Sequence, residues 1–135
     1  MVVDCIDINL GGVPAYMWRD GNVEDRAIAL TMHGLMMHGR TFDTFACKLA
    51  SRGLIVVAPD LRGFGHWHFS AEEKEESGVD YRKSLNDLIG LIENLVRAYS
   101  SLPLFCVGES LGAHLARKLV VMHPDMISGL ILSSL

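Results

Sequence analysis

The sequence predicts a three-layer α/β/α domain built on a mostly parallel sheet, with an antiparallel hairpin at its N-terminus. Two observations lead to this fold class. From residue 27 onward, short apolar runs alternate with longer segments of helical periodicity, which is the order of a parallel sheet with crossover helices on both faces. Residues 1–19 instead alternate apolar and polar positions around Gly11 and Gly12, which indicates two strands joined by a tight turn.

Composition narrows the class of protein. The 135 residues fit a single domain, half of them are hydrophobic, 21% are charged, and the formal net charge is −4. The Lys and Arg residues are scattered, so nucleic acid is excluded as the main partner. The N-terminus has no basic region, and no apolar run is long enough to span a bilayer. We therefore expect no secretory signal and no transmembrane segment.

The cysteines indicate the compartment. Cys5, Cys47 and Cys106 are an odd number without the spacing of a metal site. We expect free thiols in a cytoplasmic protein, with no metal and no cofactor.

The first elements after the hairpin are short. Residues 27–34 form an apolar run typical of a strand buried on both faces, and residues 54–60 form another. Between them, residues 41–53 predict a helix that ends at Gly53. Its expected buried face consists of Phe42, Phe45, Ala46 and Leu49.

The remaining elements continue the alternation. Residues 81–99 predict an amphipathic helix, because Leu85, Leu88, Ile89, Ile92, Leu95 and Val96 recur at helical spacing. A strand over 102–108, a helix over 109–124 and a strand over 127–135 follow.

The segment Gly108-Glu109-Ser110-Leu111-Gly112 carries the strongest chemical signal. It follows a predicted strand and opens a predicted helix, which is the context of a nucleophile elbow. Glycines at 108 and 112 relieve backbone crowding in so tight a turn, and the helix N-terminus offers N–H groups to an anion. We favour Ser110 as a nucleophile over the alternative of an N-capping serine in a Gly-rich turn.

A second signal is His33-Gly34 at the end of a strand. The following loop can turn the backbone N–H of Leu35 toward Ser110, where it would form an oxyanion hole with the N–H of Leu111. We interpret His33 as a structural residue that holds this loop. Met36 and Met37 on the same loop are candidates to line an acyl pocket, and the other methionines, Met122 among them, are expected to fill the core.

Three segments together resemble a known family. "HGLMMHGRTF", "APDLRGFGHW" and "GESLG" are similar to the α/β-hydrolase fold, most of all to its branch of monoacylglycerol lipases, lysophospholipases and serine-aminopeptidase-like enzymes. The resemblance covers nearly the whole chain. It implies that Ser110 attacks acyl or lipid esters through an acyl-enzyme, with Leu35 and Leu111 as the oxyanion-hole amides. The "GHWH" segment departs from the family, in which a small residue is common after the second glycine.

The partners of Ser110 are harder to find. In this family the acid and then the histidine follow the nucleophile. His114 would lie on the flank of the helix that Ser110 opens, and His123 and Asp125 would lie at its far end, about 20 Å away. We expect none of them to reach the serine hydroxyl.

The upstream histidines are also poor candidates. His38 lies on the oxyanion loop and could come near the serine, but the family does not use this position as a base. His66 and His68 flank Trp67 without a third metal ligand, so we expect a solvated loop.

We therefore expect residues 1–135 to be one partial α/β-hydrolase domain, without the C-terminal strands, the cap, the acid and the histidine. Such a chain would have little or no turnover alone. The last strand would be an open sheet edge, which favours self-association or a complementing chain. The alternatives are a non-catalytic binding or assembly module, one half of a split hydrolase, and an acyltransferase or C–C hydrolase of the same fold.

Overall fold

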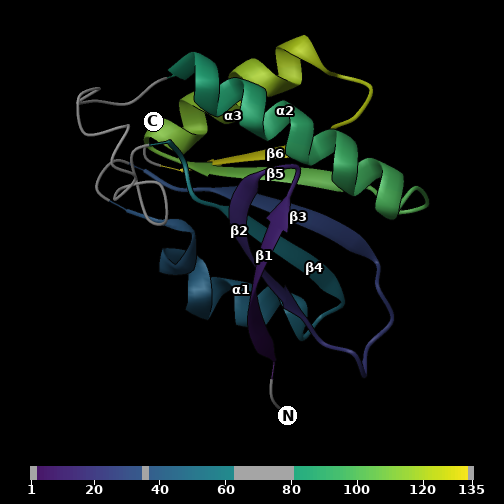
Figure 1. Cartoon of the computed structure of the whole chain (residues 1–135). Coiled ribbons are helices and arrows are strands. Elements are labelled where there is room, and N and C mark those ends of the chain that lie inside the picture. The colour runs from purple at the N-terminus through teal and green to yellow at the C-terminus, as the bar shows by residue number, and fades with distance from the viewer. Residues whose placement is uncertain (1–2, 35–36, 63–80, 134–135) are drawn as a thin grey trace.

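A mixed sheet of six strands forms the centre of the molecule (Figure 1), in the order β1-β2-β4-β3-β5-β6. The computed structural model describes residues 3–34, 37–62 and 81–133. The strands are β1 (Asp4–Leu10), β2 (Val13–Arg19), β3 (Ala27–Met32), β4 (Leu54–Pro59), β5 (Leu104–Glu109) and β6 (Gly129–Ser133). The helices are η1 (Gly39–Phe42), α1 (Asp43–Ala50), α2 (Tyr81–Ala98) and α3 (Leu111–Met122).

Strand directions confirm a mostly parallel sheet with an N-terminal hairpin. β1 pairs antiparallel with β2, and β2 pairs antiparallel with β4. β4, β3, β5 and β6 are all parallel. Gly11 and Gly12 make the two-residue hairpin turn with φ values of +62° and +86°, which glycine adopts without strain.

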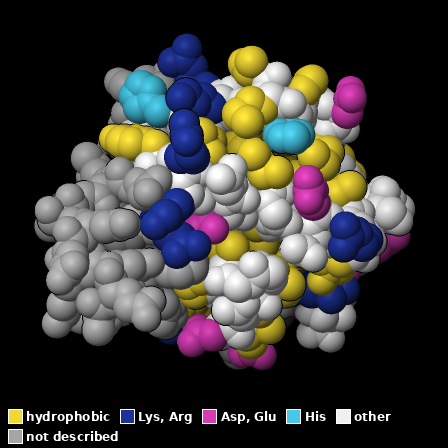
Figure 2. Space-filling view, turned by 45° about the horizontal axis from the view of Figure 1, so that its top comes forward, with side chains coloured by type: hydrophobic (Ala, Val, Ile, Leu, Met, Phe, Trp, Pro, Cys, Tyr) yellow, Lys and Arg dark blue, Asp and Glu magenta, His cyan; other side chains and the backbone are white. Residues whose placement is uncertain are grey.

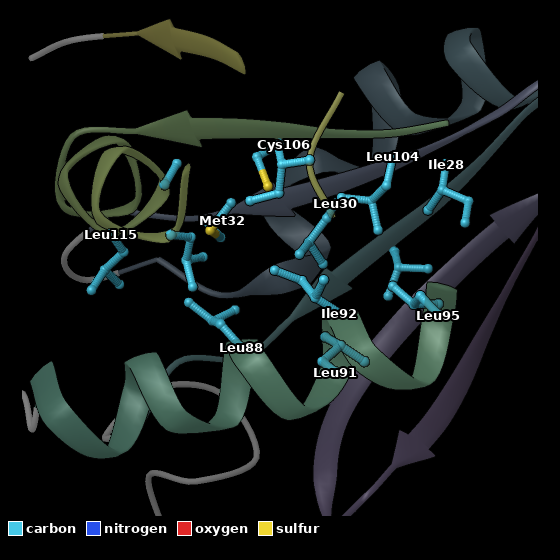
Figure 3. Packing of buried hydrophobic residues seen from close by; sticks show 14 of the residues in the cluster. Ile28, Leu30, Met32, Leu88, Leu91, Ile92, Leu95, Leu104, Cys106 and Leu115 are labelled. Carbon is cyan, nitrogen blue, oxygen red and sulfur yellow. The ribbon is translucent and has the colours of Figure 1, made fainter. Parts of the chain in front are cut away.

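The sheet lies between two layers of helix, as predicted. α2 and α3 cover one face and α1 covers the other (Figure 1). The larger core lies under α2 and α3, where the aliphatic side chains of β3 and β5 meet one face of α2 (Figure 3). Its labelled members are Ile28, Leu30, Met32, Leu88, Leu91, Ile92, Leu95, Leu104, Cys106 and Leu115.

The smaller core, under α1, differs from expectation. α1 buries Ala46 and Ala50, whereas Phe45 is exposed and packs beside Phe42. The large group on this face comes from the sheet instead: Trp18 is fully buried and donates its indole N–H to Asp43 Oδ1 at 2.9 Å. Small alanine side chains on α1 leave room for this tryptophan.

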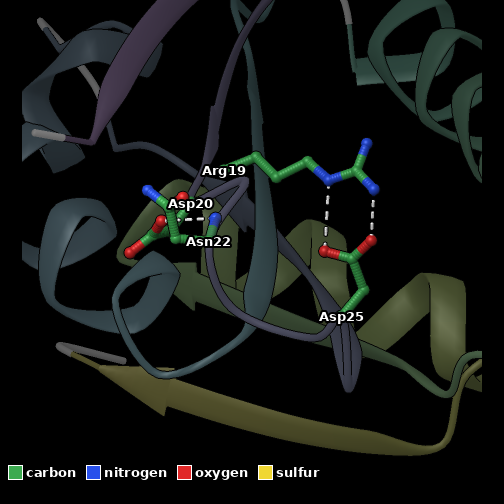
Figure 4. A network of polar contacts seen from close by, with 4 residues as sticks. All are labelled: Arg19, Asp20, Asn22 and Asp25. Carbon is green, nitrogen blue, oxygen red and sulfur yellow. Dashed lines mark hydrogen bonds and ion pairs between the residues drawn. The ribbon is translucent and has the colours of Figure 1, made fainter.

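Polar contacts among residues 19–25 hold the connection between β2 and β3 in place (Figure 4). The Arg19 guanidinium pairs with Asp25, with Nε 3.1 Å from Oδ1. Asp20 Oδ1 accepts the backbone N–H of Asn22 at 2.9 Å, which forms an Asx-type turn.

At the other end of the sheet, β6 pairs with β5 alone within the described part of the chain. Ile131 on this strand is 56% exposed. None of the helices in the described ranges has the length and apolarity to cross a bilayer.

Candidate active site

Ser110 occupies the turn between β5 and α3 in an unusual backbone conformation. Its φ is +54° and its ψ is −112°. Among the described residues it is the only non-glycine residue with a positive φ. Such a conformation costs a residue with a Cβ about 1–3 kcal/mol, and it persists where the surroundings impose it.

Two glycines impose this turn. A Cβ added at Gly108 would lie 2.4 Å from the carbonyl oxygen of Gly112, and one added at Gly112 would lie 2.0 Å from the carbonyl oxygen of Met32. The start of α3 therefore packs directly on the ends of β5 and β3. Only glycine allows these backbones to approach so closely.

Hydrogen bonds fix the backbone of Ser110 on both sides. Its N–H donates to the carbonyl of Ser133 in β6 at 2.9 Å. Its carbonyl accepts the N–H groups of Ala113 at 3.0 Å and His114 at 3.3 Å. The serine side chain is half-buried at the carboxyl end of the parallel strands, which is where sites of open α/β sheets lie.

The predicted oxyanion-hole residues are placed only in part. Leu111 is the first residue of α3, so its N–H has no intrahelical acceptor and lies at the positive end of the helix dipole. Leu35 and Met36 lie outside the described residues. Gly34 and Met37 do lie near the serine: a Cβ at Gly34 would be 3.2 Å from Ser110 Cβ and 3.3 Å from Met37 Sδ.

His33 is fully buried and both of its ring nitrogens form hydrogen bonds. The N–H of Leu61 donates to Nε2 at 2.9 Å, so Nδ1–H donates to the carbonyl of Gly34 at 2.8 Å. Burial lowers the pKa of His33, which keeps the ring neutral. His33 thus joins the loops after β3 and β4 and has no nitrogen left for Ser110.

Asp60 also anchors this loop. The sequence indicated a structural role for Asp60, with Arg62 as its ion-pair partner, but it did not indicate the contact with Gly39. Asp60 is buried and accepts the N–H of Gly39 on Oδ1 at 2.8 Å. Arg62, two residues later, pairs with Asp87 of α2 at 2.8 Å. The Asp60–Gly39 contact joins residues 21 positions apart, and no local pattern in the sequence signals such a pair.

The other candidate bases stay away from the serine. His114 is exposed on the flank of α3, and His123 is the C-cap of that helix. His38 is exposed at the start of η1. Within the described ranges, no histidine or carboxylate hydrogen-bonds to the Ser110 side chain. His66 and His68 lie outside the described residues.

The three cysteines are free thiols in the structure. Cys106 is buried in the larger core, and this burial raises the pKa of its thiol to about 12. Cys5 and Cys47 are half-buried beside the smaller core. Burial raises the pKa of both thiols as well, so none of the three is an activated nucleophile.

The sheet order, the strained serine and the glycine-lined turn define the fold as that of an α/β-hydrolase. The sequence profile of one family of this fold, the serine aminopeptidases S33, matches residues 23–134. The chain belongs to this family.

Similarity to individual proteins agrees with this assignment. The chain is 28% identical to 2-(acetamidomethylene)succinate hydrolase of Mesorhizobium japonicum over 104 residues, which are 77% of this chain and 34% of that protein. It is 25% identical to human monoglyceride lipase over 109 residues, which are 81% of this chain and 35% of the lipase. The chain thus spans about a third of the length of these relatives.

Solved structures show the same architecture. A thermostable carboxyl esterase from Bacillus coagulans superimposes with a TM-score of 0.78 at 26% identity. The match covers 98% of this chain and 44% of the esterase.

Proposed function

We propose that this chain carries the nucleophile and the oxyanion-hole amides of a serine hydrolase that acts on carboxylic esters, lipid esters among them. The observation that supports it most is the conformation of Ser110, with φ +54° in a turn where two glycines leave no space for a Cβ. A strained backbone of this kind is retained where it presents a reactive side chain.

The reaction would proceed by acyl transfer. Ser110 Oγ bonds to the ester carbonyl carbon as its proton passes to a base, and the carbonyl oxygen becomes an oxyanion. The N–H of Leu111, together with that of Leu35, would hold this oxyanion. Collapse of the tetrahedral intermediate expels the alcohol, which takes the proton. Water then attacks the acyl carbon as its proton passes to the base, the bond from the acyl carbon to Ser110 Oγ breaks, and Oγ takes that proton back as the acid leaves.

The base is the missing component. No imidazole is bonded to Ser110 in the described residues, and the matched relatives are about three times as long. We infer that residues 1–135 act as a partial domain, and that the acid and the histidine come from a segment that completes the fold. Alone, the chain would retain only the weak catalysis of an oxyanion hole and bound substrate.

The open edge of β6 would receive that segment. β6 exposes Ile131 and pairs on one side only within the described part of the sheet. Open strand edges recruit other strands. A complementing chain, or a second copy in its absence, is the partner that this edge favours, and a module that only binds is the alternative.

The substrate class is inferred from two features. Human monoglyceride lipase is among the relatives of this chain, and Met37 lies beside Gly34, which borders the serine. We propose that Met37, with Met36, lines an apolar acyl pocket. Three free cysteines are consistent with a cytoplasmic location.

A fluorophosphonate probe with mass-spectrometric site mapping tests the proposal. We expect the adduct on Ser110 and none in Ser110→Ala. Hydrolysis of a p-nitrophenyl ester should rise when a polypeptide that completes the fold is added. An adduct on other serines, unchanged in Ser110→Ala, would overturn the assignment.

A further inference from the structure

We propose that the outward face of α3 is a binding surface for membranes that contain anionic phospholipid. This face borders a groove of about 490 Å³ between α2 and α3. The groove is lined by Leu85, His114, Arg117, Lys118, Val121 and Met122. We call these six residues the α3 surface. The proposal does not depend on the chemistry of Ser110.

The α3 surface exposes large apolar side chains. Val121 is 82% exposed and Met122 is 51% exposed, although the sequence predicted Met122 to fill the core. Single exposed apolar residues are common on proteins. These two are adjacent in the chain and line the same groove as the half-buried Leu85. They extend outward from the last turn of the helix, so they suit insertion into an interface.

Positive charge accompanies them. The five α3 positions have the spacing of one helical stripe, and α3 contains no Asp or Glu to neutralise Arg117 and Lys118. Neither cation forms an ion pair within the described ranges. Arg82 lies three positions before Leu85 and so shares its side of α2. Figure 2 shows Lys and Arg side chains in a row beside hydrophobic ones on this face.

The helix dipole does not explain this arrangement. Its effect falls off within the last turn of a helix, and the last turn of α3 contains no basic residue. It also does not account for the exposed side chains of Val121 and Met122. Exposed cations beside protruding apolar side chains suit an anionic bilayer, because anionic headgroups attract the cations and the apolar side chains can enter the boundary of the acyl chains. The chain as a whole carries a net charge of −4, so this positive face is local.

Co-sedimentation with vesicles tests the surface. The chain should bind phosphatidylcholine vesicles that contain phosphatidylglycerol at least about tenfold more tightly than pure phosphatidylcholine. Added salt should weaken this binding, because it screens the cations. Arg117→Gln/Lys118→Gln should lower affinity about tenfold. Val121→Ser/Met122→Ser should lower it for both kinds of vesicle.

Matched variants separate the surface from general effects. Arg26→Gln/Arg52→Gln removes the same charge from two exposed residues near the amino ends of β3 and β4, and it should bind as the unmodified chain does. Circular dichroism checks that each variant is folded.

Equal binding to both vesicle types, or full binding by a folded Arg117→Gln/Lys118→Gln variant, would overturn the proposal. So would a change of oligomeric state in Val121→Ser/Met122→Ser without loss of vesicle binding, since a second copy would then be the occupant. Ser110→Ala should bind vesicles as the unmodified chain does. If the chain does not bind vesicles, the proposed hydrolase chemistry of Ser110 is therefore not affected.

Discussion

Gly112 packs so closely on Met32 that a single added carbon at Gly112 would lie 2.0 Å from the Met32 carbonyl oxygen. The contact joins the first turn of α3 to the end of β3. It also determines where Ser110 emerges, because the serine lies two residues before this glycine at the start of the same helix.

Gly112→Ala should therefore destabilise the chain. The methyl group has to displace backbone, which costs about 3 kcal/mol of unfolding free energy, at the high end for overpacking. Gly90→Ala in α2 is the matched control, since an added Cβ there meets nothing within 4 Å. It should stabilise the helix by about 0.5–1 kcal/mol. Urea unfolding followed by circular dichroism measures both, and equal effects would show that the Gly112 contact is not tight.

The strained backbone at Ser110 should show in the relative stability of two variants. Ser110→Gly relieves the positive φ, whereas Ser110→Ala keeps a Cβ in the same conformation. We expect the glycine variant to be more stable than the alanine variant by about 1 kcal/mol. Thermal unfolding compares the two directly. An alanine variant as stable as the glycine variant would contradict a strained turn.

His33 should make stability depend on pH. The ordinary pKa of histidine is 6.5, and burial lowers the pKa of His33 in the folded chain. Between the lowered pKa of the folded chain and 6.5, His33 is protonated in the unfolded chain but neutral in the folded chain. The unfolding free energy therefore falls as pH decreases below 6.5. The loss is complete once the pH is below the folded pKa.

Urea unfolding between about pH 5 and pH 7 measures this slope. We expect His33→Gln to reduce it, at a cost in stability because a glutamine amide replaces at most one of the two hydrogen bonds that the His33 ring forms with Gly34 and Leu61. The exposed His114→Gln should keep the slope of the unmodified chain. An unchanged slope in His33→Gln would contradict a buried neutral imidazole.

The edge of β6 should drive association. We expect the chain to form dimers or larger species at micromolar concentration, as measured by light scattering. Ile131→Lys places a charge on the exposed strand and should shift the population toward monomer. Val121→Lys, which places the same charge on an exposed side chain of α3, is the matched control and should not. A stable dilute monomer of the unmodified chain would contradict this prediction.

Much of the fold was predictable from the sequence because local patterns determine it. The apolar runs of β3, β4 and β5 and the helical spacing of α2 specify their elements without reference to the rest of the chain. The face of α1 was not predictable, because it depends on Trp18, a residue 25 positions before Asp43. The helical spacing of Phe42, Phe45, Ala46 and Leu49 alone favours burying Phe45. The structure shows that Trp18 of the sheet fills that space.

The candidate site also has a part that the sequence predicts and a part that it does not. Its glycines and serine form one contiguous segment, and the steric reason for glycine in such a tight turn is known, so the sequence indicates them. The hydrogen bonds from Gly39 to Asp60 and from Leu61 to His33 join segments far apart in the chain, so the structure was needed to find them. The exposed position of Met122 likewise depends on how α3 sits on the sheet.

Reaction of the chain with a fluorophosphonate, beside an intact serine hydrolase of the same family, measures whether Ser110 is a nucleophile that lacks its base. We expect an adduct confined to Ser110 that forms at least about a thousandfold more slowly than in the intact enzyme, since an oxyanion hole without its base retains only residual activity. Labelling at the rate of the intact enzyme would show that a base within this chain reaches the serine. Labelling that survives Ser110→Ala would show that the nucleophile lies elsewhere.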